Sequence, residues 1–121
     1  MTPFGVRLRA LRDARGISLT ELATALHVSP AYLSALEHGK RGRPTAGLIH
    51  QVNEYFGLIW DEADELVDLA RRSHPRVVVD TAGLSPAATE LANRLAREIR
   101  RLPEATILAL HGVLDQAAPR E

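Results

Sequence analysis

Histidines and serines are the side chains of this sequence best suited to chemistry, because it contains no cysteine. No two of the five histidines have the i, i+4 spacing of a zinc-binding helix, and no cluster of carboxylates accompanies them. Most serines precede expected helix starts, and none stands in the Gly-x-Ser-x-Gly turn that presents a hydrolase nucleophile. A glycine-rich phosphate loop is also missing. The sequence therefore predicts a protein that is not an enzyme and that holds neither a metal nor a cofactor.

Basic residues are concentrated in the first third of the chain. The 121 residues include 15 basic and 15 acidic side chains, which excludes a uniformly basic coat for nucleic acid. Residues 1–43 nevertheless carry seven basic and three acidic side chains, a net charge of +4, whereas residues 44–80 have a net charge of −4. The first third could therefore meet a polyanion. Charge alone leaves open that both segments are ordinary solvated helix faces.

The elements that must position these charges are helices, because apolar residues recur at helical spacing almost throughout. Ser18 and Glu21 form a capping box at the start of one expected helix. Ser29-Pro30 starts the next, with an N-cap hydroxyl followed by the proline favoured at the first helical position. Only His27 and Val28 separate these two helices, which predicts a helix-turn-helix. In all, we expect five helices in this part of the chain, over about 4–16, 18–27, 29–39, 45–57 and 60–73.

The pattern changes after His74-Pro75. Residues 76–80 form the only β-branched run and predict a short strand. Ser85-Pro86 and Pro103-Glu104 then start two more helices, each with an apolar stripe. One strand and two such helices bury little by themselves, so we expect this segment to need a partner.

A second copy of the chain is the partner that we expect, with the two strands paired antiparallel and the helical stripes covered. The alternative is a monomer in which the segment folds back on its own acidic fifth helix. The residues expected to mediate dimerisation are Val77, Val78, Val79, Leu91, Leu95, Ile99, Leu102, Ile107, Leu110 and Leu114.

Residues from Gly16-Ile17-Ser18 to Gly39-Lys40-Arg41 resemble the Cro-like phage-repressor (XRE) helix-turn-helix family, and the resemblance extends over about residues 4–66. It implies a five-helix DNA-binding fold in which the helix from Ser29 to His38 lies in the major groove. Amides at the starts of both motif helices are placed to donate to phosphate. The basic loop 40–44 follows the reading helix. The expected DNA contacts are Ser18, Ser29, Pro30, Ala31, Tyr32, Ser34, His38, Lys40, Arg41 and Arg43.

The outer face of the expected reading helix departs from the family pattern. Many relatives carry Gln, Asn or Arg there, where such side chains pair with bases. In this sequence only Tyr32 and Ser34 can hydrogen-bond a base edge, so we expect modest direct readout and a larger role for phosphate contacts and DNA shape.

Two further positions match the family's structural pattern. Arg12 and Glu37 match a pair that links the first helix to the end of the reading helix, and we interpret them as a structural ion pair rather than a DNA contact. Trp60 matches a position at which the family packs an apolar side chain between the fourth and fifth helices, so we expect it in the core.

The sequence thus predicts an all-α protein: a five-helix helix-turn-helix DNA-binding domain over 1–73, then a short strand and a two-helix oligomerisation tail over 74–121. We expect a dimeric repressor of a bacterial or phage operon that binds double-stranded DNA with two half-sites. The alternative is an antitoxin that binds a toxin through its tail and autoregulates its operon. The absence of a long apolar run or a secretory signal at Met1-Thr2-Pro3-Phe4 predicts a cytoplasmic protein.

Overall fold

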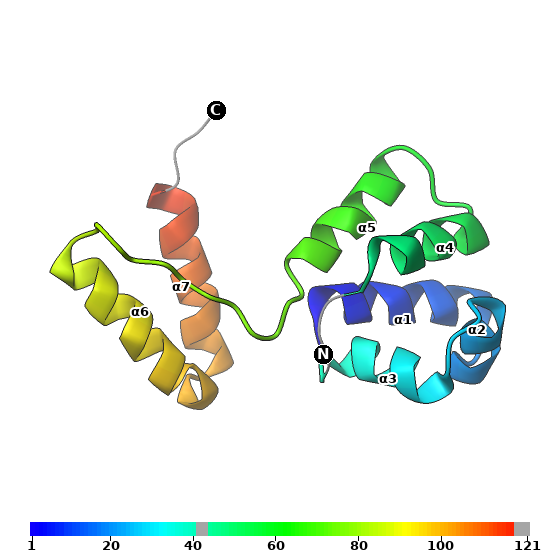
Figure 1. Cartoon of the computed structure of the whole chain (residues 1–121), viewed down its shortest axis with the longest axis horizontal. Coiled ribbons are helices and arrows are strands. Elements are labelled where there is room, and N and C mark those ends of the chain that lie inside the picture. The colour runs from blue at the N-terminus through cyan, green and yellow to red at the C-terminus, as the bar shows by residue number, and fades with distance from the viewer. Residues whose placement is uncertain (41–43, 118–121) are drawn as a thin grey trace. The chain divides into compact units, whose positions relative to one another are not determined.

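The computed structural model describes residues 1–40 and 44–117, and all regular secondary structure among them is helical (Figure 1). They divide into two compact units, which we name the head unit (Met1–Val77) and the tail unit (Val78–Glu121). None of the helices in these described parts of the chain is long and apolar enough to cross a membrane. The elements are α1 (Pro3–Arg15), α2 (Leu19–Ala25), α3 (Pro30–His38), α4 (Ala46–Phe56), α5 (Asp61–Arg71), α6 (Pro86–Glu98), the short 3₁₀ helix η1 (Ile99–Arg101) and α7 (Glu104–Ala117).

Local capping explains where these helices begin. The Ser18 hydroxyl accepts a hydrogen bond from the Glu21 amide, and the Glu21 carboxylate accepts one from the Ser18 amide, as the capping box predicts. The Ser29 and Ser85 hydroxyls cap α3 and α6 by accepting hydrogen bonds from the Tyr32 and Ala88 amides, and each serine is followed by proline. The expected starts of these three helices are therefore confirmed.

The core of the head unit forms around α1, which packs against both α3 and α5. Helix α2 packs against α3, and α4 packs against α5 (Figure 1). Each of these helices buries one apolar stripe. The fully buried aliphatic and aromatic side chains that fill this core include Phe4, Leu8, Leu22, Leu33, Val52 and Leu66.

Helix α1 approaches the end of α3 unusually closely. A Cβ atom at Gly5 would lie 2.1 Å from the backbone carbonyl oxygen of Glu37, so only glycine permits this contact. At the same end of α1, the Thr2 side chain caps the helix by accepting a hydrogen bond from the Gly5 amide. The first turn of α1 thereby fixes where α3 ends.

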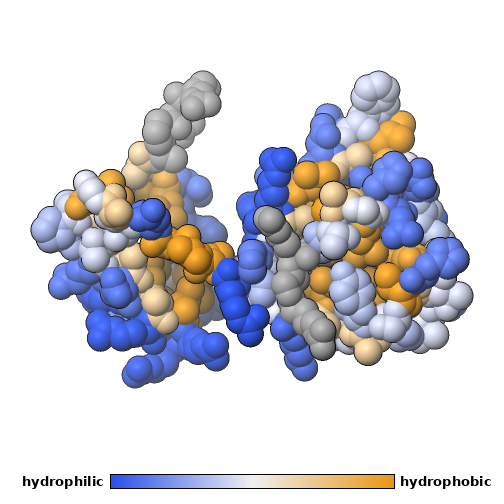
Figure 2. Space-filling view, in the orientation of Figure 1, coloured by the Kyte–Doolittle hydropathy of each residue, from blue (hydrophilic) through white to orange (hydrophobic). Residues whose placement is uncertain are grey.

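The tail unit lacks a core of its own in its described residues. No side chain of α6, η1 or α7 is buried. Leu95, Leu102 and Ile107 are half-buried, but Leu91 and Leu114 are 56% and 67% exposed. Apolar surface is accordingly visible on this unit in the space-filling view (Figure 2). A unit with this much exposed apolar surface is short of the burial that stabilises an independent fold.

The expected strand over residues 76–80 is wrong. The structure contains no strand among its described residues, and Val77 to Val79 lie in exposed irregular chain, with Val78 at 95% exposure. β-Branched composition favours extended backbone, but a strand also requires a second segment to pair with its amides and carbonyls. The described residues of the single chain supply no such segment.

The expectation that Trp60 lies in the core is also wrong, since its side chain is 82% exposed. Leu58 is buried instead, and Ile59 and Trp60 follow it on the outside of the turn between α4 and α5. Of the four residues in this turn, only Leu58 is buried in the core. Trp60 occupies the N-cap position of α5 at φ 53°, where a non-glycine residue is strained.

Replacing Gly5 with alanine is expected to destabilise the head unit by about 1–3 kcal/mol, because the added methyl group would press on the backbone of α3. Gly47→Ala in α4 is the matched control. Its Cβ would meet open space, and alanine favours the helix by up to about 1 kcal/mol. Urea unfolding followed by circular dichroism measures both changes. Equal midpoints for the two variants would contradict the close contact.

Candidate nucleic-acid interface

The turn between α2 and α3 is held by backbone hydrogen bonds. The Val28 amide donates to the Ala23 carbonyl at 3.0 Å, and the His27 amide donates to the Thr24 carbonyl at 3.2 Å. His27 adopts φ 58°, which reverses the chain within two residues of the end of α2. Two helices joined by such a short turn keep a fixed angle to each other, as in a helix-turn-helix.

Helix α3 turns one face to the core and leaves the other outside. Leu33 and Leu36 are buried and fix the rotation of the helix. Pro30 and Ala31 at its start are exposed, whereas Tyr32 is half-buried and packs against the core. The N-terminal half of α3 is therefore the part of the helix that can approach another molecule.

Ser18 and Ser29 are exposed at the starts of α2 and α3, but their hydroxyl groups are engaged as caps. The groups that can bind an anion at these two positions are the backbone N–H groups of each first turn. These N–H groups have no acceptor within the helix. These amides lie at the positive end of the helix dipole, where phosphate oxygens bind favourably.

His38 is tied back onto α3. Its Nδ1 lies 2.9 Å from the Ser34 carbonyl oxygen and donates to it, because a carbonyl can only accept. The Ser34 hydroxyl lies 3.5 Å from the same Nδ1. With Nδ1 engaged, a neutral His38 presents an acceptor at Nε2, so only the protonated ring can donate to a phosphate.

Lys40 is exposed directly after α3, and its amide donates to the Ala35 carbonyl at 3.0 Å. It therefore lies at the C-terminal end of the expected reading helix. The two other expected cations of this loop, Arg41 and Arg43, lie outside the described residues.

Arg12 and Glu37 are in direct contact. Arg12 Nε donates to Glu37 Oε2 at 2.9 Å and Nη2 donates to Oε1 at 3.2 Å, while Nη1 donates to the Ile17 carbonyl at 3.2 Å. The two side chains are only 10% and 2% exposed. The hydrogen bond to Glu37, followed by the charge of that carboxylate, raises the pKa of Arg12. One buried guanidinium thus joins α1, the α1–α2 turn and the end of α3.

Sequence reasoning missed the role of Arg15, which it counted only as part of the basic first third. Arg15 Nη2 donates to the Phe56 carbonyl at 2.7 Å and Nη1 donates to the Tyr55 carbonyl at 3.1 Å. Its guanidinium also stands 4.9 Å from the centre of the Phe56 ring. Arg15 therefore caps the C-terminus of α4, a role for which no local sequence signal exists.

Comparison with known families finds one model, described as a helix-turn-helix domain, that matches residues 3–66. This range covers slightly more than half of the chain and extends from the start of α1 into the middle of α5. No solved structure matches the chain significantly.

Curated relatives match the same part of the chain. The HTH-type transcriptional repressor RghR of Bacillus subtilis is 42% identical over 65 residues, which are 50% of this chain and 48% of the relative. An uncharacterised HTH-type transcriptional regulator of the same organism, RghRB, is 42% identical over 52 residues, 43% of this chain and 37% of the relative. The HTH-type transcriptional regulator RamB of Mycobacterium tuberculosis is 42% identical over 57 residues, 47% of this chain and 12% of the relative. The chain thus spans less than half the length of each.

Arg12→Ala is expected to lower the free energy of unfolding by about 3 kcal/mol, because it leaves the Glu37 carboxylate buried without its main partner. This value is at the lower end for buried pairs, since Arg9 also lies 4.0 Å from Glu37. The double variant Arg12→Met with Glu37→Leu should regain most of the loss, because no charge is then left buried. The matched control is Arg94→Ala, which breaks an exposed ion pair and should change little. Urea unfolding at the same midpoint as the parent would show that the Arg12–Glu37 pair does not hold α3.

Proposed function

The chain belongs to the helix-turn-helix domain family, and from that premise we propose that it is a DNA-binding transcriptional regulator that acts as a dimeric repressor. The observation that carries this proposal is the arrangement of α2 and α3. The four-residue turn between α2 and α3 and a buried apolar stripe fix α3, and its N-terminal half stays accessible. The similarity to RghR, a transcriptional repressor, favours repression over activation.

In the proposed complex, α3 lies in the major groove and α2 crosses the DNA backbone. Tyr32 and Ser34 are the side chains that meet base edges. Lys40 and the amides at the starts of α2 and α3 bind phosphates, and we assign the same role to Arg41 and Arg43 from the sequence alone. Protonated His38 adds a phosphate contact through Nε2.

Glu37 does not oppose this binding, although it stands on the reading helix. Its carboxylate is buried against Arg12, and the local charge is therefore compensated inside the head unit. The exposed side chains at the end of α3, His38 and Lys40, are neutral or positive. The surface offered to the DNA backbone at this end of the helix is consequently not acidic.

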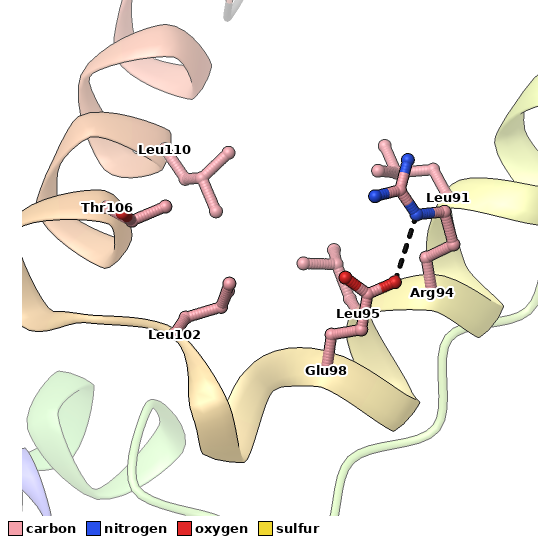
Figure 3. Close-up of a pocket in the computed structure, with 7 residues that line it drawn as sticks. All are labelled: Leu91, Arg94, Leu95, Glu98, Leu102, Thr106 and Leu110. Atoms are coloured by element: carbon pink, nitrogen blue, oxygen red, sulfur yellow. Dashed lines mark hydrogen bonds and ion pairs between the residues drawn. The ribbon is translucent and has the colours of Figure 1, made fainter.

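Dimerisation is assigned to the helices of the tail unit and a second copy of it. Between α6 and α7 lies a groove of about 230 Å³ into which Leu95, Leu102 and Leu110 point (Figure 3). Leu91 lines the same groove, and Arg94 pairs with Glu98 at 3.0 Å along its edge. A two-fold copy can cover the apolar lining and bring each arginine near the other copy's glutamate. Two head units would then reach half-sites one helical turn apart, about 34 Å.

Tyr32→Ala and Ser34→Ala are each expected to weaken binding to operator DNA by about 1–3 kcal/mol and to weaken binding to random duplex much less. The reason is that a lost base contact penalises only the sequence that supplied it. Fluorescence anisotropy with DNA from the region upstream of the gene, and with a scrambled duplex of equal length, measures both effects. Equal losses on the two duplexes would reassign these side chains to phosphate contacts.

Leu91→Asp combined with Leu114→Asp is expected to convert the dimer to a monomer, because both side chains are more than half exposed on the single chain. Asn93→Asp, on the polar side of α6, is the charge control and should leave the dimer intact. Light scattering gives the mass of each. A parent that is already monomeric would refute the dimer, and one that pairs only with a co-expressed protein from its operon would favour the antitoxin alternative.

A further inference from the structure

The C-terminus of α5 is pinned to the first turn of α1. The Ser73 hydroxyl is buried, accepts a hydrogen bond from the Phe4 amide at 2.8 Å and donates to the Leu69 carbonyl. Because a serine hydroxyl has one proton and two lone pairs, these two bonds hold it in one orientation. The chain that follows Ser73 therefore leaves the head unit from a fixed point.

That point lies on the same edge of the head unit as the end of α3. Thr2, two residues before Phe4, contacts Gly39: a Cβ on Gly39 would be 2.6 Å from the Thr2 methyl group. Gly5 rests on the backbone of Glu37 at the other side of the same turn. The start of α1 thus lies between the ends of α3 and α5 (Figure 1).

This edge gathers cations from an otherwise acidic part of the chain. Residues 44–80 contain seven acidic and three basic side chains, and all three basic ones, Arg71, Arg72 and Arg76, fall within six residues around Ser73. All three are exposed, as is Lys40 after α3. We name Arg71, Arg72 and Arg76 the α5-end arginines.

The acidic groups near these arginines leave the edge positive. Glu37 is buried against Arg12. Asp68 pairs with Arg72 at 3.0 Å, but both side chains are about 60% exposed, and such a surface pair holds its partners weakly. Arg72 can therefore exchange Asp68 for another anion at little cost.

We propose that the α5-end arginines bind DNA phosphates beside the C-terminal end of α3, and so extend the contact surface beyond the helix-turn-helix. The proposal rests on the proposed function, because it places α3 in the major groove. The major groove is about 8.5 Å deep, and a helix with its side chains is about 10 Å across. When α3 lies in the groove, the phosphates along the groove edges therefore reach the level of the helix that packs behind α3. The first turn of α1 occupies that layer at this edge, and the end of α5 adjoins this turn through the hydrogen bond from the Phe4 amide to the Ser73 hydroxyl. Arginine suits the task, because its planar guanidinium binds two phosphate oxygens together.

The test uses the full chain with Arg71, Arg72 and Arg76 all changed to glutamine. Each lost phosphate contact should flatten the dependence of log K on log salt by about 0.9, so the slope should fall by about 2–3 on operator and random duplex alike. The matched control changes three exposed arginines of the tail unit to glutamine, namely Arg97, Arg100 and Arg101. It alters the net charge equally and should leave the slope unchanged. Lysine in place of the three α5-end arginines should restore most of the slope.

Circular dichroism melting checks that both glutamine variants stay folded, since none of the six side chains is buried. An unchanged slope in the Arg71, Arg72 and Arg76 variant would overturn the proposal, and so would an equal flattening in the tail control, which would indicate a general charge effect. In either case, sensitivity of operator binding to Tyr32→Ala would leave the proposed function standing. A parent chain that binds neither duplex at low salt would overturn both.

Discussion

The buried contact between α1 and the end of α3 is the constraint on which the rest of the head unit depends. At this contact Arg12 binds Glu37 through two hydrogen bonds, and two turns earlier on α1 Gly5 lets the two backbones touch. A buried ion pair adds little net stability over an apolar pair of the same size, but it tolerates few geometries. Here it also reaches the Ile17 carbonyl before α2. The pair therefore sets the position of both motif helices relative to α1, and it removes a carboxylate from the surface that α3 offers to DNA.

The starts of the helices were predictable from sequence because capping is local. Ser18 with Glu21, and Ser29 with Pro30, satisfy amides within three or four residues of themselves, so their effect does not depend on the rest of the fold. The resemblance of residues 4–66 to a known family then supplied the packing of five helices, which periodicity alone would have left open. Only the structure could show contacts between distant residues, such as Ser73 with Phe4 or Arg15 with the end of α4.

The two wrong expectations have different origins: for Val77 to Val79 a local preference was taken for a tertiary environment, and for Trp60 a family position was carried over to this chain. Val77 to Val79 favour extended backbone, yet pairing needs a second strand, and the described residues contain none. Trp60 has the largest side chain of the turn after α4, yet Leu58 is the residue of this turn that is buried. Burial depends on the geometry of the elements that meet at a position, and at the turn after α4 this chain departs from the packing that the family resemblance implied.

The net charge of zero conceals a separation of charges that fits the proposed function. All acidic side chains of α5 except Asp68 stand in its first two turns, where the positive end of the helix dipole favours them, and its basic side chains follow at the opposite end. The basic end of α5 lies on the same edge of the head unit as the C-terminal end of α3 and Lys40. The head unit can therefore present this positive edge to a polyanion.

Two features fit the proposed dimer: the small number of base-contacting side chains on α3, and the exposed apolar surface of α6 and α7 in the tail unit. With only Tyr32 and Ser34 able to bond bases, one head unit discriminates weakly between sequences, and phosphate contacts add affinity without discrimination. Joining two head units multiplies the base contacts and makes the second binding step intramolecular. In the proposed dimer, the apolar surface of α6 and α7 is buried only when two chains meet, so ordering of the tail unit, pairing of chains and tight operator binding depend on one another. A regulator built in this way would respond steeply to its own concentration, and this property follows from an apolar surface that the single chain leaves uncovered.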